Sequence, residues 1–252
     1  MSGYQLFSQF YDNLTFNVDY VKRADYLQSV LSLCGHPWGL TLDLACGTGS
    51  LTVELKRRGV DIFGIDGSYD MLGIAMDKAY DEELEVLFLC QRMEELDLYG
   101  TIDTCVCTLD SLNHITDKEK LQRVFDRVAL FMNPDGHFIF DVNTVYKHRH
   151  ILADNTFVYD TDSVYCVWNN SLKENNIIQI DLDMFEREGE VYHRYSEHFK
   201  ERAYEIDEIK GMLAQSGFEV KAVYHDMTTE SLRDNSDRAI IVARIIEAIN
   251  KE

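Results

Sequence analysis

An α/β fold with a doubly wound, mostly parallel seven-stranded sheet is the fold class that this sequence predicts, and two observations lead to it. From residue 40 to residue 142, short apolar runs alternate with segments of helical spacing. Such alternation is typical of parallel strands joined by helical crossovers. Between residues 151 and 202 the rhythm changes, because four strand-like segments follow one another without helices. This second pattern predicts a small antiparallel β insertion.

The alternating part contains five predicted strands. They are residues 40–44, 60–66, 84–89, 103–109 and 137–142. Apolar residues recur at helical spacing before and between these runs, in residues 21–34, 68–80 and 117–132. After the insertion, residues 205–216 predict another helix, and residues 218–224 and 238–244 predict the last two strands.

The insertion shows a period of two. Isoleucine, leucine and methionine at even positions from Ile178 to Met184 alternate with polar residues, as in a sheet with one buried face. Its predicted strands are 156–160, 163–172, 177–186 and 191–202, with turns at 173–176 and 188–190. We therefore expect residues 1–150 and 203–252 to form one domain, into which residues 151–202 are inserted.

A glycine turn follows the first predicted strand. Leu40, Leu42 and Leu44 give a short buried strand that stops at Gly47 and Gly49, and Ser50 then begins a helix. Glycines at such a turn let the backbone approach a ligand closely, and the helix N-terminus presents N–H groups to it.

An acid ends the second predicted strand. Asp66 lies seventeen residues after Gly49, close to the spacing at which an acid meets ribose hydroxyls in βαβ units. Asp43, Asp110 and Asp141 also lie at strand ends. Since ligands bind at the carboxyl ends of parallel strands, these acids predict a nucleotide-type site there.

The segment from Leu42 to Gly49, LDLACGTG, resembles the first motif of class I S-adenosylmethionine-dependent methyltransferases. The resemblance implies that the protein is an enzyme that transfers the methyl group of S-adenosyl-L-methionine to a small-molecule acceptor by in-line displacement. It also implies a set of cofactor-binding residues, in which Met71 and Met93 flank the adenine. This set is Tyr11, Tyr20, Asp43, Ala45, Cys46, Gly47, Gly49, Asp66, Gly67, Met71, Arg92, Met93 and Leu109.

Two other functions remain open at this point. A nicotinamide-dependent dehydrogenase would carry a third glycine at position 52, where this chain has Thr52. A catalytically silent cofactor-binding or regulatory module is favoured by Arg92, which cannot accept a hydrogen bond from the adenine amino group where the family usually has an acid.

Residues 108–114 resemble the family's fourth motif and supply the catalytic candidates Asp110 and His114. A histidine can take a proton from the acceptor, although displacement at a sulfonium can proceed by alignment alone. The alternative for Asp110 is a helix cap. We expect the substrate to be bound by Asn113, Asn143, Trp168, His193 and Tyr195.

Composition limits the partners. The formal net charge of −20 disfavours nucleic acid as a substrate, and no apolar run is long enough to span a membrane. The first residues do not pair a basic stretch with an apolar one, so we expect no secretory signal. The six cysteines form no C-x-x-C pair, which predicts reduced thiols, a cytoplasmic location and no metal site.

The insertion has two interpretations. It starts after the fifth strand, beside the predicted crevice, and it is rich in aromatic and histidine residues, so we expect a lid over the acceptor. The alternative is a dimerisation sheet, which leaves the oligomeric state open between monomer and homodimer.

We also expect Gly49→Val to fold, because Gly49 is placed at a crevice rather than in the core.

Overall fold

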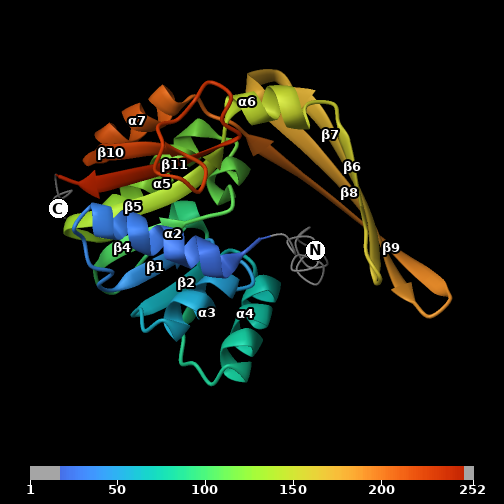
Figure 1. Ribbon diagram of the computed structural model, residues 1–252, viewed down its shortest axis with the longest axis horizontal. Helices are drawn as coiled ribbons and strands as arrows, with labels where there is room; N and C mark the ends of the chain where they lie inside the picture. The colour runs from blue at the N-terminus through green and yellow to red at the C-terminus, as the bar shows by residue number, and fades with distance from the viewer. Residues whose placement is uncertain (1–17, 247–252) are drawn as a thin grey trace.

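The computed structural model describes residues 18–246 and contains two β-sheets, as Figure 1 shows. The larger sheet has seven strands in the order β10-β11-β5-β4-β1-β2-β3. Its strands are β1 (Thr41–Leu44), β2 (Ile62–Asp66), β3 (Phe88–Cys90), β4 (Ile102–Cys107), β5 (Met132–Asn143), β10 (Phe218–His225) and β11 (Arg238–Ile245). β11 pairs antiparallel with β5 and with β10, and the remaining pairs are parallel. The predicted fold class is therefore confirmed.

Helices cover both faces of this sheet. They are α2 (Tyr20–Leu33), α3 (Ser50–Arg57), α4 (Tyr69–Asp81), α5 (Lys118–Phe131), α6 (Val145–Lys147) and α7 (Ile206–Gln215). Apolar side chains of α5 and α7 pack on one face, around Phe125, Phe138 and Phe140. Those of α2 and α3 pack on the other face, around Leu27 and Leu55. Burying both faces explains why the central strands are almost continuously apolar.

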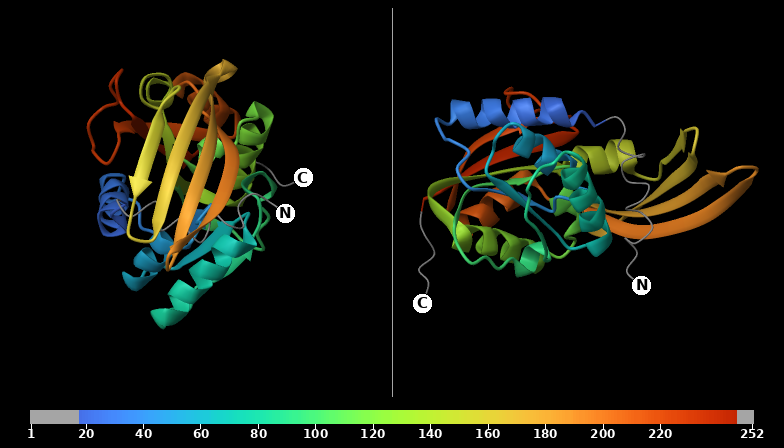
Figure 2. Two further views of the ribbon diagram at one scale, coloured as in Figure 1. Left: turned by 90° about the vertical axis from the view of Figure 1, so that its right-hand side faces the viewer. Right: turned by 90° about the horizontal axis from the view of Figure 1, so that it is seen from below.

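The second sheet is a four-stranded antiparallel meander in the order β6-β7-β8-β9. Its strands are β6 (Thr156–Asp160), β7 (Val164–Lys173), β8 (Ile177–Glu188) and β9 (Val191–Arg202). Figures 1 and 2 show it projecting from the α/β part as an arm. Its even-numbered apolar residues on β8 are buried in a core of their own. Short helical turns complete the chain: η1 (Met93–Glu95), η2 (Ser111–His114), η3 (His148–Leu152) and η4 (Glu174–Asn176).

Two predicted strands have wrong boundaries, since β5 begins at Met132 rather than at residue 137 and the third strand is shorter than expected. Residues 84–89 were expected as the third strand, but β3 is only Phe88–Cys90. The amide of Leu84 donates to the carbonyl of Ala79, which continues the end of α4, and Leu87 is exposed. An edge strand needs few residues to complete its ladder, so a short apolar run there is a weak guide to its length.

Candidate active site

The carboxyl ends of β1, β2, β4 and β5 meet at one edge of the larger sheet, and the candidate site lies there. Ala45, Gly47 and Gly49 all have positive φ (60°, 55° and 72°), so the chain reverses sharply between β1 and α3. Cys46 donates its amide to the carbonyl of Ile65, which ties the turn to β2. A Cβ added at Gly47 would meet nothing within 4 Å. Gly47 therefore faces open space where a ligand can approach the backbone.

Gly49 is packed, and this corrects the expectation that Gly49→Val would fold normally. A Cβ added at Gly49 would lie 2.7 Å from the Cβ and 3.2 Å from the Cα of Ala75 on α4. The glycine thus allows α4 to pack closely against the turn. A valine would both strain the left-handed backbone and push α4 away.

Asp66 ends β2 with its carboxylate held by two backbone amides. Gly47 donates to Oδ2 at 2.9 Å, and Ser68 donates to Oδ1 at 2.8 Å. Burial raises the pKa of Asp66, and these two hydrogen bonds oppose the shift. Each carboxylate oxygen has a second lone pair, so a fixed pair of acceptors remains for two hydroxyls.

Asp43 is buried beneath the turn, where its carboxylate holds α3. The hydroxyl of Thr52 donates to its Oδ2 at 2.6 Å. Burial raises the pKa of Asp43 to about 7. Thr52, which stands in place of a third glycine, therefore has a structural partner in this chain.

A narrow cleft lies between the glycine turn and the segment after β4. It is lined by Tyr20, Asp43, Ala45, Cys46, Gly47, Thr48, Ser50, Leu51, Thr108, Leu109 and Ser111. Lys78 on α4, which the sequence reasoning missed, donates to the hydroxyls of Thr48 and Ser50 at 3.0 and 2.7 Å. Its positive charge therefore lies beside the start of α3, where it adds to the attraction of the helix N-terminus for an anion.

Gly67, Met71, Arg92 and Met93 lie around the end of β2. Met71 is buried, and Met93 packs on the main core. A Cβ added at Gly67 would lie 3.8 Å from Cγ of Arg92, so these two positions adjoin. The guanidinium of Arg92 donates to Glu94 at 3.0 and 2.7 Å. Tyr11 lies outside the described residues.

Asp141 at the end of β5 holds the segment after β4 in an unusual conformation. Leu109 and Asp110 have φ of 59° and 53°. Their amides donate to the carboxylate of Asp141 at 2.9 and 2.7 Å. Left-handed backbone costs energy in residues other than glycine, and these hydrogen bonds offset it. The segment is therefore fixed against the cleft.

Two arginines neutralise the buried acids at this point, and sequence reasoning missed both. Arg23 of α2 donates to Asp141 at 3.1 Å. Arg238 of β11 donates to Asp141 and, at 2.5 Å, to Asp110. Burial alone would raise the pKa of Asp110, but the charge of Arg238 outweighs it and holds that pKa below its usual range. Asp110 therefore stays ionised.

His114 lies beside a buried glutamate of the meander. Its Nε2 is 3.8 Å from Oε1 of Glu201, and Oε2 of Glu201 is 3.8 Å from Nε2 of His148. One ligand atom from each of Asp110, His114 and Glu201 lies within 4.8 Å of the others. Arg238 already supplies the positive charge that a cation would bring to Asp110. The cluster thus places a histidine, which can accept a proton, beside carboxylates that can stabilise the resulting charge.

A second cavity adjoins His114, where η2 meets the base of the meander. It has a volume of about 430 Å³ and is lined by His114, Thr116, Gln179, His198, Phe199 and Lys200. The ring of His114 lies 5.3 Å from that of Phe199. Residues 108–114 thus border both the cleft at the glycine turn and this cavity.

Comparison with known proteins identifies the family. Residues 41–136 match the model of a methyltransferase domain. A protein of Geobacillus sp. (strain WCH70), described as a "putative methyltransferase", is 31% identical over 244 residues, which cover 96% of this chain and 99% of the relative. The chain belongs to the S-adenosylmethionine-dependent methyltransferase family.

Solved structures agree with this assignment. An S-adenosylmethionine-dependent methyltransferase from Clostridium acetobutylicum ATCC 824 superposes with a TM-score of 0.88 at 30% identity, covering 96% of this chain and 98% of that one. The S-adenosylmethionine-bound amino pentose methyltransferase CalS10 from Micromonospora echinaspora has the same fold (TM-score 0.76, 15% identity, 96% and 97% covered). The methyl donor of this methyltransferase is S-adenosylmethionine, and the open backbone at Gly47 and the fixed acceptors of Asp66 suit it.

Asn113, which we expected to bind substrate, uses its amide for contacts within the methyltransferase. It is buried, and its amide Nδ2 donates to the carbonyls of Asn143 and Arg202 at 3.1 and 2.9 Å. Its Oδ1 accepts from the amide of Asn143. Asn143 in turn donates to Glu201 at 3.3 Å and accepts from Lys147 at 2.8 Å. These two asparagines join η2, β5 and β9 by hydrogen bonds and so hold together the elements that form the site.

The three meander residues expected to bind substrate lie outside the cavity beside His114. Trp168 donates to Asn170 and packs in the core of the meander. Tyr195 packs against that same core. His193 lies near the tip of the β8–β9 hairpin, 2.9 Å from Glu188. The side chains that do reach this cavity come from the base of the meander. Residue type and the period of two in the sequence could not indicate that the base, and not the tip, would border the cavity.

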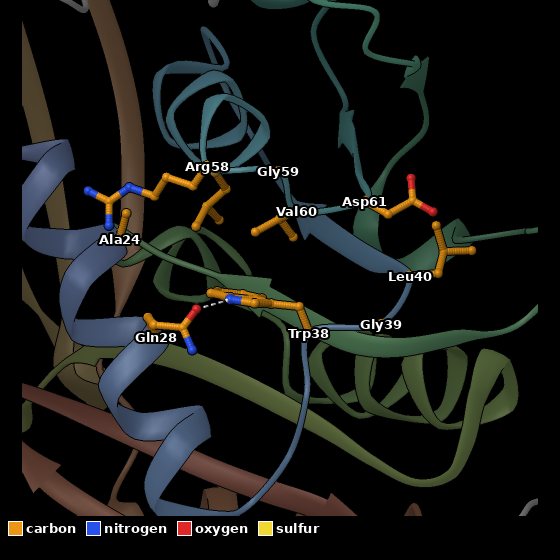
Figure 3. Close-up of a pocket in the computed structure, with 10 residues that line it drawn as sticks. Ala24, Gln28, Trp38, Gly39, Leu40, Arg58, Gly59, Val60 and Asp61 are labelled. Atoms are coloured by element: carbon orange, nitrogen blue, oxygen red, sulfur yellow. Dashed lines mark hydrogen bonds between the residues drawn. The ribbon is translucent and has the colours of Figure 1, made fainter.

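The methyltransferase has a further cavity at the opposite edge of the sheet, of about 480 Å³. Figure 3 shows it between α2 and the segments that lead into β1 and β2, with Trp38 donating to Gln28 at 2.6 Å. Parallel sheets bind ligands at the carboxyl ends of their strands, and this cavity is at the amino ends. We assign no role to it. In the described part of the chain, no helix has the length and apolarity to cross a membrane.

Proposed function

We propose that the acceptor is a polar small molecule bound in the cavity between η2 and the base of the meander. The observation that carries this proposal is the shared segment: Leu109 lines the cofactor cleft, and His114, five residues later, lines the cavity. A donor in the cleft and an acceptor in the cavity would both lie against residues 109–114. The volume of about 430 Å³ is in the range of small-molecule sites.

The chemistry of the lining supports a polar acceptor. The lining residues include two imidazoles, an amide and an ammonium group together with the phenyl ring of Phe199. CalS10, which has the same fold, is an amino pentose methyltransferase. A sugar-sized molecule with hydroxyl or amino groups would satisfy these polar groups, whereas the net charge of −20 opposes a polyanion such as RNA.

Asp110 and His114 have different roles in this proposal. The pKa of Asp110 is held low by Arg238, so its carboxylate accepts hydrogen bonds and does not act as a base. His114 lies on the cavity and is the residue that can take a proton. The remaining cofactor assignments of the sequence, from Ala45 to Met93, stay predictions.

A cavity-filling variant tests the acceptor site. Phe199→Trp should reduce transfer of a labelled methyl group to a small-molecule cell extract at least tenfold while S-adenosylmethionine binding by calorimetry stays within twofold. Tyr195→Trp, on the same strand but outside the cavity, is the matched control and should leave both unchanged. Equal transfer by Phe199→Trp and the parent would contradict this placement.

We also propose a cytoplasmic location, where the thiols would stay reduced. All six cysteines lie in the described region and are free, and burial raises the pKa of Cys105 and Cys107 well above the usual value. Detection of a disulfide in protein isolated from its natural source would argue against it.

A further inference from the structure

Glu201 places a buried carboxylate between two imidazoles at the end of β9. Its side chain is 5% exposed, and its two oxygens each lie 3.8 Å from an imidazole Nε2, that of His114 and that of His148. Asn143 donates to Oε2 at 3.3 Å. A carboxylate withdrawn from water to this degree is costly unless donors surround it. Glu201 therefore favours a proton on an imidazole nitrogen that faces it.

The hydrogen bond of His148 places its proton on the ring nitrogen that faces away from Glu201. Its Nδ1 lies 2.9 Å from the carbonyl oxygen of Asn176. A carbonyl only accepts, so this bond assigns a proton to Nδ1. Its Nε2 is buried, has no hydrogen-bond partner and lies toward Glu201. In a neutral ring Nε2 then carries the lone pair, so His148 gives Glu201 no donor, and the groups that can donate to Glu201 are Asn143 and His114.

The carboxylate of Glu201 also favours one tautomer of His114. Nε2 of His114 lies 3.8 Å from Oε1 of Glu201, so the negative charge favours a proton on that nitrogen. In a neutral ring the lone pair then resides on Nδ1. His114 lines the cavity, so Nδ1 is the ring nitrogen that is left to take a proton from a methyl acceptor bound there.

We propose that Glu201 is a positioning residue that sets His114 as the proton acceptor of the transfer, and that the methyl acceptor reacts through a protic oxygen or nitrogen. The inference rests on the proposed acceptor site. The acceptor atom forms its bond to the methyl carbon as the carbon–sulfur bond breaks, and the electron pair stays on sulfur. The acceptor's proton moves to Nδ1 of His114.

Charge balance explains why a buried carboxylate is useful here. Bound S-adenosylmethionine supplies an electrophilic methyl group and one positive charge. The reaction removes that charge from sulfur, and the proton that His114 accepts places one positive charge on its imidazole. The negative charge of Glu201 stabilises the new imidazolium. A small side-chain movement would bring the two groups, 3.8 Å apart, into hydrogen-bonding distance. An acceptor that released no proton would give this arrangement no purpose.

Other charged groups surround these three residues and would contribute to any pH dependence. Lys147 of α6 contacts Asn143, which holds Glu201. Asp110 lies next to His114 and Glu201 and accepts a hydrogen bond from Arg238. Asp66, His198 and Lys200 also lie near His114. A variant of Glu201 alone separates its effect from theirs.

Nitrogen NMR of histidine-labelled protein tests the tautomer without any acceptor. His114 of the parent should carry its proton on Nε2, and Glu201→Gln should give a mixture of both tautomers. Glu197→Gln is the matched control, because Glu197 is a second buried glutamate on β9. A proton on Nδ1 of His114 in the parent would overturn the proposal, even if Glu201→Gln failed to fold.

Transfer of a ¹³C-methyl group to a small-molecule extract tests the acceptor class. The labelled carbon should appear bonded to oxygen or nitrogen, and Glu201→Gln should lower the rate about 10²-fold and change its pH profile, with S-adenosylmethionine affinity retained. Label on carbon or sulfur, or a parental rate in Glu201→Gln, would overturn the inference. If the parent bound the donor and methylated nothing, the proposed function would fail, and the NMR result would still decide the role of Glu201.

Discussion

The cofactor side and the acceptor side of the site are built in different ways. On the cofactor side, backbone geometry dominates: positive φ at Gly47 and Gly49, and amides that fix Asp66. On the acceptor side, side chains far apart in sequence are paired, such as Arg23 with Asp141 (118 residues apart) and Arg238 with Asp110 (128 residues apart). On the cofactor side, residues close together in the sequence are enough to position S-adenosylmethionine. On the acceptor side, the position of each functional side chain depends on contacts made by the whole fold.

The largest expected effect is on the acceptor side. Arg238→Met removes a cationic partner from Asp110 and from the buried Asp141, which keeps Arg23, and breaking a buried ion pair from one side costs about 3–5 kcal/mol of unfolding free energy. Urea unfolding measures it. Arg244→Met is the control on the same strand, since its pair with Glu219 is partly exposed (side chains 35% and 44%) and should cost less than about 1 kcal/mol. Equal losses would remove the distinction between the two sides.

The two glycines of the turn should differ. Gly49→Ala adds left-handed strain and a contact of 2.7 Å with Ala75, so it should lower the unfolding free energy by about 2–4 kcal/mol. Gly47→Ala meets open space and should cost only about 1–2 kcal/mol. Gly47→Ala should nonetheless weaken S-adenosylmethionine binding, because its methyl group enters the cleft. Thermal unfolding and calorimetry of both variants check this order.

Asp66 tests the cofactor side directly. Asp66→Asn replaces one acceptor oxygen by a donor, and loss of a charge-assisted hydrogen bond is worth ~1.5–3 kcal/mol, an affinity loss of about 10- to 150-fold. Asp61→Asn, just before the same strand and exposed, should bind the donor normally. Calorimetry with S-adenosylmethionine decides it. Parental affinity in Asp66→Asn would show that this carboxylate does not contact the ribose.

The stability of the protein should depend on pH through Asp43. Its pKa rises to about 7 on folding because of burial, so the folded state holds a proton that the unfolded state loses near pH 4. Stability from this group is present below pH 4 and declines as pH rises toward 7, by at most about 1.4 kcal/mol per pH unit. Asp43→Asn should remove that decline. Urea unfolding of both proteins from pH 4 to 8 would show parallel curves if the carboxyl were ionised throughout.

The smallest effect is expected at the tip of the arm. Replacing residues 187–192 by Asn-Gly joins Glu186 to His193, which already face each other in the ladder. Donor affinity and methyl transfer should stay within twofold, because the cavity is lined by the base of the meander. Sedimentation tests the alternative interpretation: a parent dimer that becomes a monomer on truncation would favour a dimerisation sheet.

The sequence by itself determined the α/β pattern, the antiparallel insertion and the cofactor edge. Strand periodicity, the glycine turn and the strand-terminal Asp66 are local features, encoded within about twenty-five residues, so pattern alone could locate them. The contacts of Asn113 could not be predicted, for the opposite reason. Its amide is used by the carbonyls of Asn143 and Arg202, and nothing near residue 113 reveals them.

Only the tertiary structure decided what surrounds the acceptor. Arg23, Arg238 and Glu201 come from α2, β11 and β9, and each has a side chain that would ordinarily be assigned to solvent. Their burial depends on partners brought together by sheet order and by the return of the chain from the meander. A buried charge is stable only when those partners are present, and a sequence does not state which partners will be near.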